Sequence, residues 1–204
     1  MIESLKRAGG TSGRRAATVA LALSVGMLWL ASPSVAQPAP PAPTPQGAAP
    51  ATAEKVAGID KLLAVSPTVS LAGAVPPAAM TALAARGVKT FVSLRVADEQ
   101  GYDAAATEAA ARAAGLQWVA APFNGEAPDA AAVDKVLAEL AKAELGSTVL
   151  SCRSGGRAAM MWYAHRVLNG GAEPDTAFAE AESQGLTRAE LKTFIQKYVA
   201  DHRK

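Results

Sequence analysis

Short apolar runs alternate with helix-forming stretches through the last two thirds of this 204-residue chain. Each run is bounded by glycine, proline or a helix start, which is typical of buried strands. The predicted strands are 69–72, 88–94, 116–121 and 148–151. The first predicted helix begins at 76–77 and ends at 87. The next four cover 104–114, 129–145, 158–168 and 175–183, and the last runs from 187 to the terminus. This alternation predicts an α/β fold with a mostly parallel central sheet flanked by helices.

Helix starts within this pattern carry recognisable local signals. Asp129 is predicted to cap the helix that follows it, and Thr187 with Glu190 has the spacing of a capping box. The run 160–163 joins two methionines to a tryptophan and a tyrosine. Four adjacent positions point around the whole circumference of a helix, so this run indicates core packing and not a cofactor-lining cluster.

The first 36 residues have the order of charges and apolar residues that is typical of a secretory signal peptide. Four basic side chains precede an uncharged run over 16–31, and 34–36 is a small-residue cleavage site. We therefore predict that the mature chain begins at Gln37 and is periplasmic or secreted. The alternative is a retained membrane anchor, although the run is shorter than the roughly 20 residues of a spanning helix.

Residues 37–53 are rich in proline and alanine without periodicity, which indicates a disordered linker, and 54–204 is long enough for one globular domain. The whole chain has a formal net charge of +2. Without the first 36 residues it has 16 Lys and Arg against 17 Asp and Glu, or −1. This balance indicates no nucleic-acid partner. The single cysteine cannot form an internal disulfide.

That cysteine, Cys152, follows the strand predicted at 148–151 and precedes a helix. Ligands of α/β sheets bind at such strand ends. Gly155 and Gly156 allow backbone amides to converge on an anion, the helix N-terminus adds a favourable field, and Arg157 can grip two oxygens. The same field favours a thiolate nucleophile. An inert buried cysteine in a glycine-containing turn is the alternative, but an inert turn has no need of two flanking arginines.

The sequence Cys152-Arg-Ser-Gly-Gly-Arg157 resembles the signature loop of the phosphatase-like domain of beta-lactamase-hydrolase-like bacterial proteins. This family is a branch of the cysteine-dependent phosphatases, and its members are also labelled sulfurtransferases. The resemblance extends from about Val69 to about Gln184 and includes 69–73, 76–77, 87–95 and 114–119. It implies a hydrolase in which Cys152 attacks phosphorus and Arg157 holds the oxyanion. The anion would also contact Arg153, Ser154, Gly155 and Gly156.

The loop differs from that of ordinary tyrosine phosphatases at three points. Four residues separate Cys152 from Arg157, whereas those phosphatases have five, and the spacing of four is similar to that of rhodanese sulfurtransferases. Ser151 stands where they have histidine, and Ala158 where they have serine or threonine. These differences keep open a sulfurtransferase that carries a persulfide on Cys152, and also a non-catalytic anion-binding module.

Two further residues are candidates for the site. The resemblance places a general acid on the loop 122–129, where Glu126 is the best candidate, with an ordinary solvated carboxylate as the alternative. Arg95 ends a central strand at the same edge and could contact an anionic substrate, or pair instead with Asp98 or Glu99. His165 lies two turns beyond the loop, which indicates a packed or surface histidine.

The sequence thus predicts an exported cysteine-nucleophile hydrolase of the tyrosine and dual-specificity phosphatase-like class. Its substrate would be an anionic small molecule or a phosphorylated compound. No metal or other cofactor, no nucleic acid and no membrane span after signal cleavage are expected.

Overall fold

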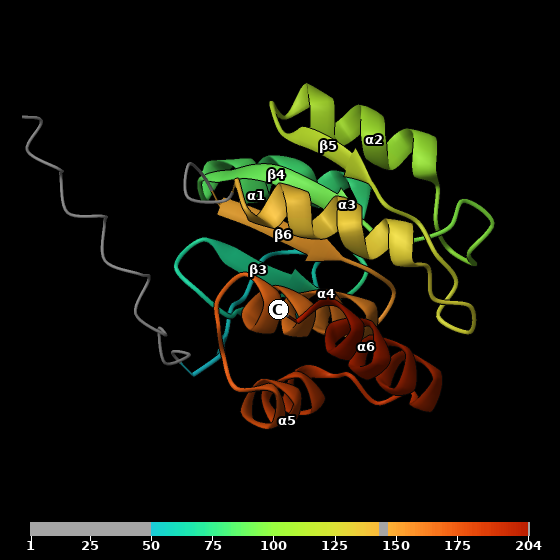
Figure 1. Ribbon diagram of the computed structural model, residues 1–204. Coiled ribbons are helices and arrows are strands. Elements are labelled where there is room, and N and C mark those ends of the chain that lie inside the picture. Colours follow the sequence, from blue (N-terminus) through green and yellow to red (C-terminus); the bar gives the residue numbers. More distant parts are fainter. Residues whose placement is uncertain (1–49, 143–146, 204) are drawn as a thin grey trace, which may run out of the picture. The chain divides into compact units, whose positions relative to one another are not determined.

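The computed structural model describes residues 50–142 and 147–203 (Figure 1). The strands are β1 (Thr52–Ala53), β2 (Leu62–Ala64), β3 (Val69–Ala72), β4 (Val88–Ser93), β5 (Gln117–Ala120) and β6 (Ser147–Ser151). The helices are the 3-10 turn η1 (Pro77–Ala79), α1 (Met80–Ala85), α2 (Ala104–Ala113), α3 (Ala130–Leu140), α4 (Gly156–Leu168), α5 (Pro174–Gln184) and α6 (Ala189–His202). All four predicted strands and all six predicted helices are present.

These strands form one sheet in the order β1-β2-β3-β6-β4-β5. β3, β6, β4 and β5 are parallel, while β1 and β2 are antiparallel to their neighbours. β6 lies between β3 and β4, and its residues 148–151 are all buried, as a central strand requires. The prediction of an α/β fold with a mostly parallel sheet is therefore confirmed.

The antiparallel edge was not predicted from the sequence. β1 pairs Ala53 with Leu63, and β2 pairs Leu63 with Leu71 of β3. β1 lies at the end of the range 37–53 that the sequence assigns to a linker, so the sheet begins within that range. The predicted signal peptide and residues 37–49 of the linker lie outside the described residues. Within 50–142 and 147–203, no helix is long and apolar enough to cross a bilayer.

Helices cover both faces of the sheet (Figure 1). On one face, α1 and α2 pack against side chains that alternate along the strands, among them Phe91 and Val149. On the other face, α3 and α4 pack against Val92 and Leu150, and α5 and α6 extend that core. Because successive strand residues point to opposite faces, β4 and β6 supply both cores with apolar side chains.

α4 carries the residues that follow Cys152 and is the most deeply buried helix of the described chain. Residues 160–163 on it are at most 5 % exposed, which confirms that they are core. Because other elements surround α4, packing fixes its position. The cysteine loop lies at the N-terminus of this helix and is therefore held by a rigid element.

The predicted helix signals had different outcomes. Asp129 caps α3, with its side chain accepting a hydrogen bond of 3.0 Å from the amide of Ala131. The predicted capping box at Thr187 and Glu190 is wrong, because α6 begins after Arg188 without a side-chain cap. Glu190 instead lies 3.7 Å from Nε of Arg188, so the glutamate that would complete the box faces a cation.

Candidate active site

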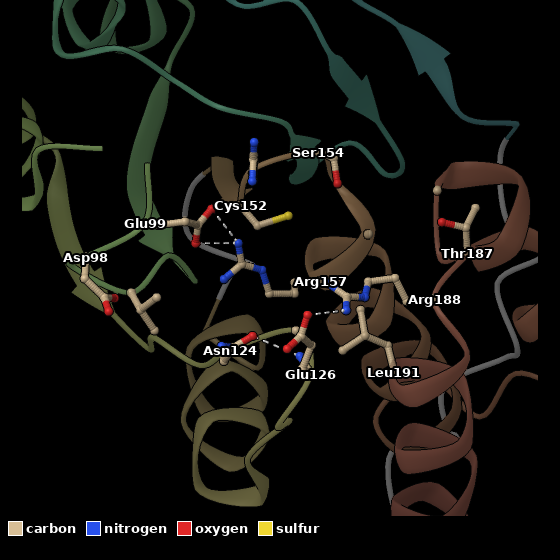
Figure 2. Close-up of a pocket in the computed structure, with 15 residues that line it drawn as sticks. Asp98, Glu99, Asn124, Glu126, Cys152, Ser154, Arg157, Thr187, Arg188 and Leu191 are labelled. Carbon is tan, nitrogen blue, oxygen red and sulfur yellow. Dashed lines mark hydrogen bonds and ion pairs between the residues drawn. The ribbon is translucent and has the colours of Figure 1, made fainter. Parts of the chain in front are cut away.

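The strand register places the cysteine loop at the carboxyl edge of the sheet. Ser151, the last residue of β6, lies beside both Ala72 of β3 and Ser93 of β4. Cys152 follows it, with its amide donating to the carbonyl oxygen of Ala72 at 3.3 Å. The Cys152 side chain is buried, with 1 % of the residue exposed, and its sulfur points toward the pocket in Figure 2.

The loop closes back on the sulfur of Cys152. The amide of Gly155 donates to Sγ at 3.1 Å, a contact that stabilises negative charge on sulfur. Gly155 has a φ of +94°, a region open to glycine, and α4 starts at Gly156. A Cβ added at Gly156 would lie 2.8 Å from the carbonyl oxygen of Gly185. Both glycines are therefore required by the shape of the loop.

Carbonyl groups on the outer side of the loop have partners of their own. The carbonyl of Arg153 accepts from the amide of Ala74 at 3.1 Å, and that of Ser154 accepts from Nζ of Lys61 at 3.4 Å. Lys61 also donates to the carbonyl of Gln184 at 2.6 Å. Bonding these carbonyls from outside keeps their negative ends away from the cysteine. Lys61 thereby fastens the loop to the turn between α5 and α6.

Arg157 is buried and bonded at both ends of its guanidinium group. Nη1 donates to the carbonyl oxygens of Leu94 and Phe123, each at 2.8 Å. Nη2 donates to both carboxylate oxygens of Glu99, at 2.9 and 2.7 Å. Arg157 therefore joins three loops at the carboxyl edge of the sheet. Its two-point grip is on Glu99, which leaves Nε–H as the donor without a partner among residues 50–142 and 147–203.

Glu99 receives a second arginine from its other side. Nε of Arg95 lies 3.1 Å from Oε1 of Glu99, and the Arg95 guanidinium stacks 4.3 Å from the centre of the Tyr102 ring. The two alternatives for Arg95 were contact with an anionic substrate or pairing with a nearby carboxylate. The structure places it in the pair with Glu99, where it is 7 % exposed.

A pocket of about 330 Å³ opens above the cysteine. Its floor includes Cys152, Gly156 and Arg157, and its rim includes Arg153 and Ser154. The cysteine loop forms one wall, the loop that follows β5 forms a second, and the turn before α6 forms a third (Figure 2). Val96, Asp98 and Glu99 from the loop after β4 complete the lining. These three walls come from segments far apart in the sequence, and the sheet edge brings them together.

Glu126 lies on the second wall and is exposed. Its side chain is 73 % accessible and lies 3.2 Å from Nη2 of Arg188, which comes from the third wall (Figure 2). The amide of Glu126 donates to Oδ1 of Asn124 at 3.0 Å, which fixes the turn that carries it. The carboxylate thus faces the same pocket as Cys152, with a cation as its partner.

The structure brings most of the predicted site residues to this pocket. Cys152, Arg153, Ser154, Gly156, Arg157 and Glu126 line it, and Gly155 contacts the sulfur directly. Sequence reasoning missed Lys61 and Arg188, and it gave Glu99 only as a partner for Arg95. His165 stacks on Trp162, and burial, followed by nearby Arg166, lowers the pKa of the imidazole. His165 is half-buried, and its stacking on Trp162 fits the packed one of the two alternatives, packed or surface, that its position leaves open.

Solved structures share this fold. A DUF442 protein from Shewanella putrefaciens CN-32 has 15 % identity and a TM-score of 0.61, covering 72 % of this chain and 94 % of its own. TpbA of P. aeruginosa in complex with pTyr has 22 % identity and a TM-score of 0.56, with coverages of 73 % and 87 %. The kinase associated phosphatase KAP has 12 % identity, a TM-score of 0.58, and coverages of 65 % and 86 %. No curated protein matches the chain in sequence.

Fold and loop together define a domain of the cysteine-phosphatase-like class. Residues 44–168 match the family described as beta-lactamase hydrolase-like protein, phosphatase-like domain, and this is more than half of the chain. The chain therefore belongs to that family, as its loop sequence predicts. The match ends with α4, so α5, α6 and the turn that carries Arg188 lie beyond it.

Proposed function

We propose that this protein is an exported hydrolase that removes phosphate from a phosphorylated substrate with Cys152 as nucleophile. The observation that carries the proposal is the hydrogen bond from the Gly155 amide to Sγ, at the floor of a pocket that also exposes a carboxylate. The complex of TpbA with pTyr supports a phosphorylated substrate. The family membership supports the same class of reaction.

The reaction would proceed in two steps. The Cys152 thiolate attacks phosphorus, the bond from phosphorus to the leaving oxygen breaks, and that oxygen takes a proton from Glu126. Water then attacks phosphorus of the cysteinyl phosphate, Glu126 accepts a proton of the water, and the S–P bond breaks to release phosphate and return the Cys152 thiolate. Loop amides, the N-terminus of α4 and Nε–H of Arg157 would stabilise the equatorial oxygens. Arg157 also holds the loop in place through Glu99.

A second candidate function is sulfur transfer, favoured by the four residues between Cys152 and Arg157. Here the thiolate attacks the outer sulfur of a thiosulfate, sulfite leaves, and Cys152 carries a persulfide. This step needs no general acid. Purified protein should therefore be assayed for phosphate release, for thiocyanate formation from thiosulfate and cyanide, and for equilibrium phosphate binding. Binding without either turnover would indicate a non-catalytic module.

Replacing Glu126 with glutamine tests the general acid. A poor leaving group needs a proton and an activated one does not, so hydrolysis of phenyl phosphate should fall about a hundredfold, with p-nitrophenyl phosphate much less affected. The measurement is kcat/KM for both esters in the same buffer, because this ratio reports the first step and not the second, in which Glu126 also takes part. Glu190→Gln is the matched control, because Glu190 also pairs with Arg188 but does not line the pocket.

Two outcomes would contradict the acid role of Glu126. One is an equal loss of kcat/KM for both esters. The other is a protein that hydrolyses neither ester and gains the mass of one sulfur at Cys152 on incubation with thiosulfate. The second result would select the sulfurtransferase.

Export is tested by the first residue of the mature protein. Cleavage after Ala36 should give a chain that begins at Gln37, because the basic start, apolar run and small residues occur in the required order. Intact-mass spectrometry of protein isolated from the cell envelope measures this directly. A chain that retains Met1 and its apolar run in the membrane fraction would contradict cleavage.

A further inference from the structure

Arg188 places a second accessible guanidinium group at the pocket. It comes from the turn before α6, and its side chain is 47 % accessible. Its guanidinium lies across Gly125, so that a Cβ added there would be 3.2 Å from Nη1. Figure 2 shows Arg188 and Glu126 pointing toward one another from opposite walls. The ion pair thus spans the pocket between the loop after β5 and the turn before α6.

Arg157 and Arg188, two of the three arginines that line this pocket, are bound very differently. Arg157 is 8 % exposed, and its partners are buried carbonyls and Glu99. Arg188 is held by two exposed carboxylates, Glu126 at 3.2 Å and Glu190 at 3.7 Å. Exposed ion pairs contribute little to stability, whereas a phosphate can take two parallel hydrogen bonds from one arginine. A ligand anion can therefore replace Glu126 at Arg188 far more easily than it can replace Glu99 at Arg157.

The ion pair also involves the candidate general acid. While Nη2 of Arg188 holds Oε1 of Glu126 at 3.2 Å, that oxygen faces the cation and not a leaving group above Cys152. An anion that takes this place on Arg188 leaves Oε1 of Glu126 free to turn toward the leaving group. The pocket has room for a small organic molecule that reaches from Cys152 to the third wall.

We infer that Arg188 binds a second anionic group of the substrate, a phosphate or a carboxylate, while Cys152 attacks the first phosphate. The substrate class is thus a phosphate ester with a further anionic group, and its binding releases Glu126 from the ion pair. This inference rests on the proposed function for the reaction itself. Arg188 lies beyond residues 44–168, so the specificity comes from a segment outside the family match.

The test compares three phosphate esters that have the same phenol ring in the leaving group: phenyl phosphate, 1,4-phenylene bisphosphate and 4-carboxyphenyl phosphate. The protein should prefer one or both of the doubly anionic esters in kcat/KM, and the pair of them distinguishes phosphate from carboxylate as the second group. Arg188→Ala should reduce that preference about tenfold or more, the value of a charge-assisted pair of hydrogen bonds. Arg188→Lys, which keeps the charge without the planar fork, should give an intermediate ratio.

Lys192→Ala is the matched control. Lys192 lies in the first turn of α6, pairs with Glu182 at 2.6 Å and does not line the pocket, so this variant removes the same charge from a position close to Arg188 in the chain. It should leave the preference between esters as in the unmodified protein. A similar fall in preference for Lys192→Ala and Arg188→Ala would overturn the inference, because general electrostatic attraction would then explain it.

Equilibrium binding separates this inference from the proposed function. Calorimetry on Cys152→Ser, with and without Arg188→Ala, measures affinity for each ester in the absence of turnover. Tighter binding of a doubly anionic ester that depends on Arg188 would support the subsite even if no ester is hydrolysed, in which case only the proposed hydrolase fails. Equal affinity for all three esters, or binding of none, would overturn the subsite.

Discussion

Replacing Cys152 with serine should abolish turnover in either enzymatic reaction. A serine hydroxyl can accept the hydrogen bond from the Gly155 amide, so the loop should keep its shape. The hydroxyl does not ionise at neutral pH as a thiol can, and it cannot form a persulfide. Phosphate release by Cys152→Ser should therefore fall to the rate in buffer alone, while thermal unfolding changes little. Both are measured on the same preparation.

Ser183→Ala is the control for this prediction. Ser183 lies on α5, is exposed, donates to the carbonyl oxygen of Glu180 and does not line the pocket. Its loss should leave turnover unchanged. If Cys152→Ser retained the activity of the unmodified protein, the nucleophile would have to be another group.

Arg157→Lys should damage both stability and turnover, although it conserves the charge. A lysine ammonium cannot reach Leu94, Phe123 and both oxygens of Glu99 with the planar geometry of a guanidinium group. Buried carbonyls would lose their donors, which costs about 1–3 kcal/mol for each unsatisfied group. Urea unfolding should show a lower free energy of unfolding, and turnover should fall severely because the loop beside Cys152 is no longer held.

Two comparison variants separate the roles of the arginines. Arg95→Lys also weakens the contact with Glu99, but Arg95 does not line the pocket, so stability should fall more than turnover. Arg153→Ala removes an exposed side chain at the rim and should chiefly weaken substrate binding, seen as a raised KM. Equal and mild losses in Arg157→Lys and Arg153→Ala would contradict this division.

The parallel strands could be predicted because the signals that mark them lie within short stretches of sequence. The strands from Val69 and Val88 are short segments rich in apolar residues, and glycine or proline marks the helix boundaries between them. β2 was not predicted, because three residues give too little periodicity and their pairing with β3 depends on chain folding. The capping box failed for a related reason. Thr187 and Glu190 have the right spacing, but Arg188 gives Glu190 a charged partner.

The sequence allowed the residues within the cysteine loop to be predicted, but not the contacts between this loop and distant segments. Cys152, the glycines and Arg157 are adjacent in sequence, so their common role can be derived from spacing. The partner of Arg157 is Glu99, 58 positions away, and the partner of Glu126 is Arg188, 62 positions away. Only the topology of the sheet brings such pairs together. From the sequence alone, Arg157 is expected to bind a ligand. In the structure, its guanidinium group also holds three loops together.

The ammonium group of Lys61 has a consequence for where this domain can be shortened. Lys61 precedes β2, so it belongs to the antiparallel edge, and it bonds the carbonyls of Ser154 and Gln184. A chain that began at Val69 would keep all four parallel strands but would lose Ile59, Leu62 and Val65 from the two cores. It would also lose Lys61, whose side chain joins the cysteine loop to the end of α5. A fragment cut back to the parallel sheet therefore lacks a contact that holds the site in its working shape.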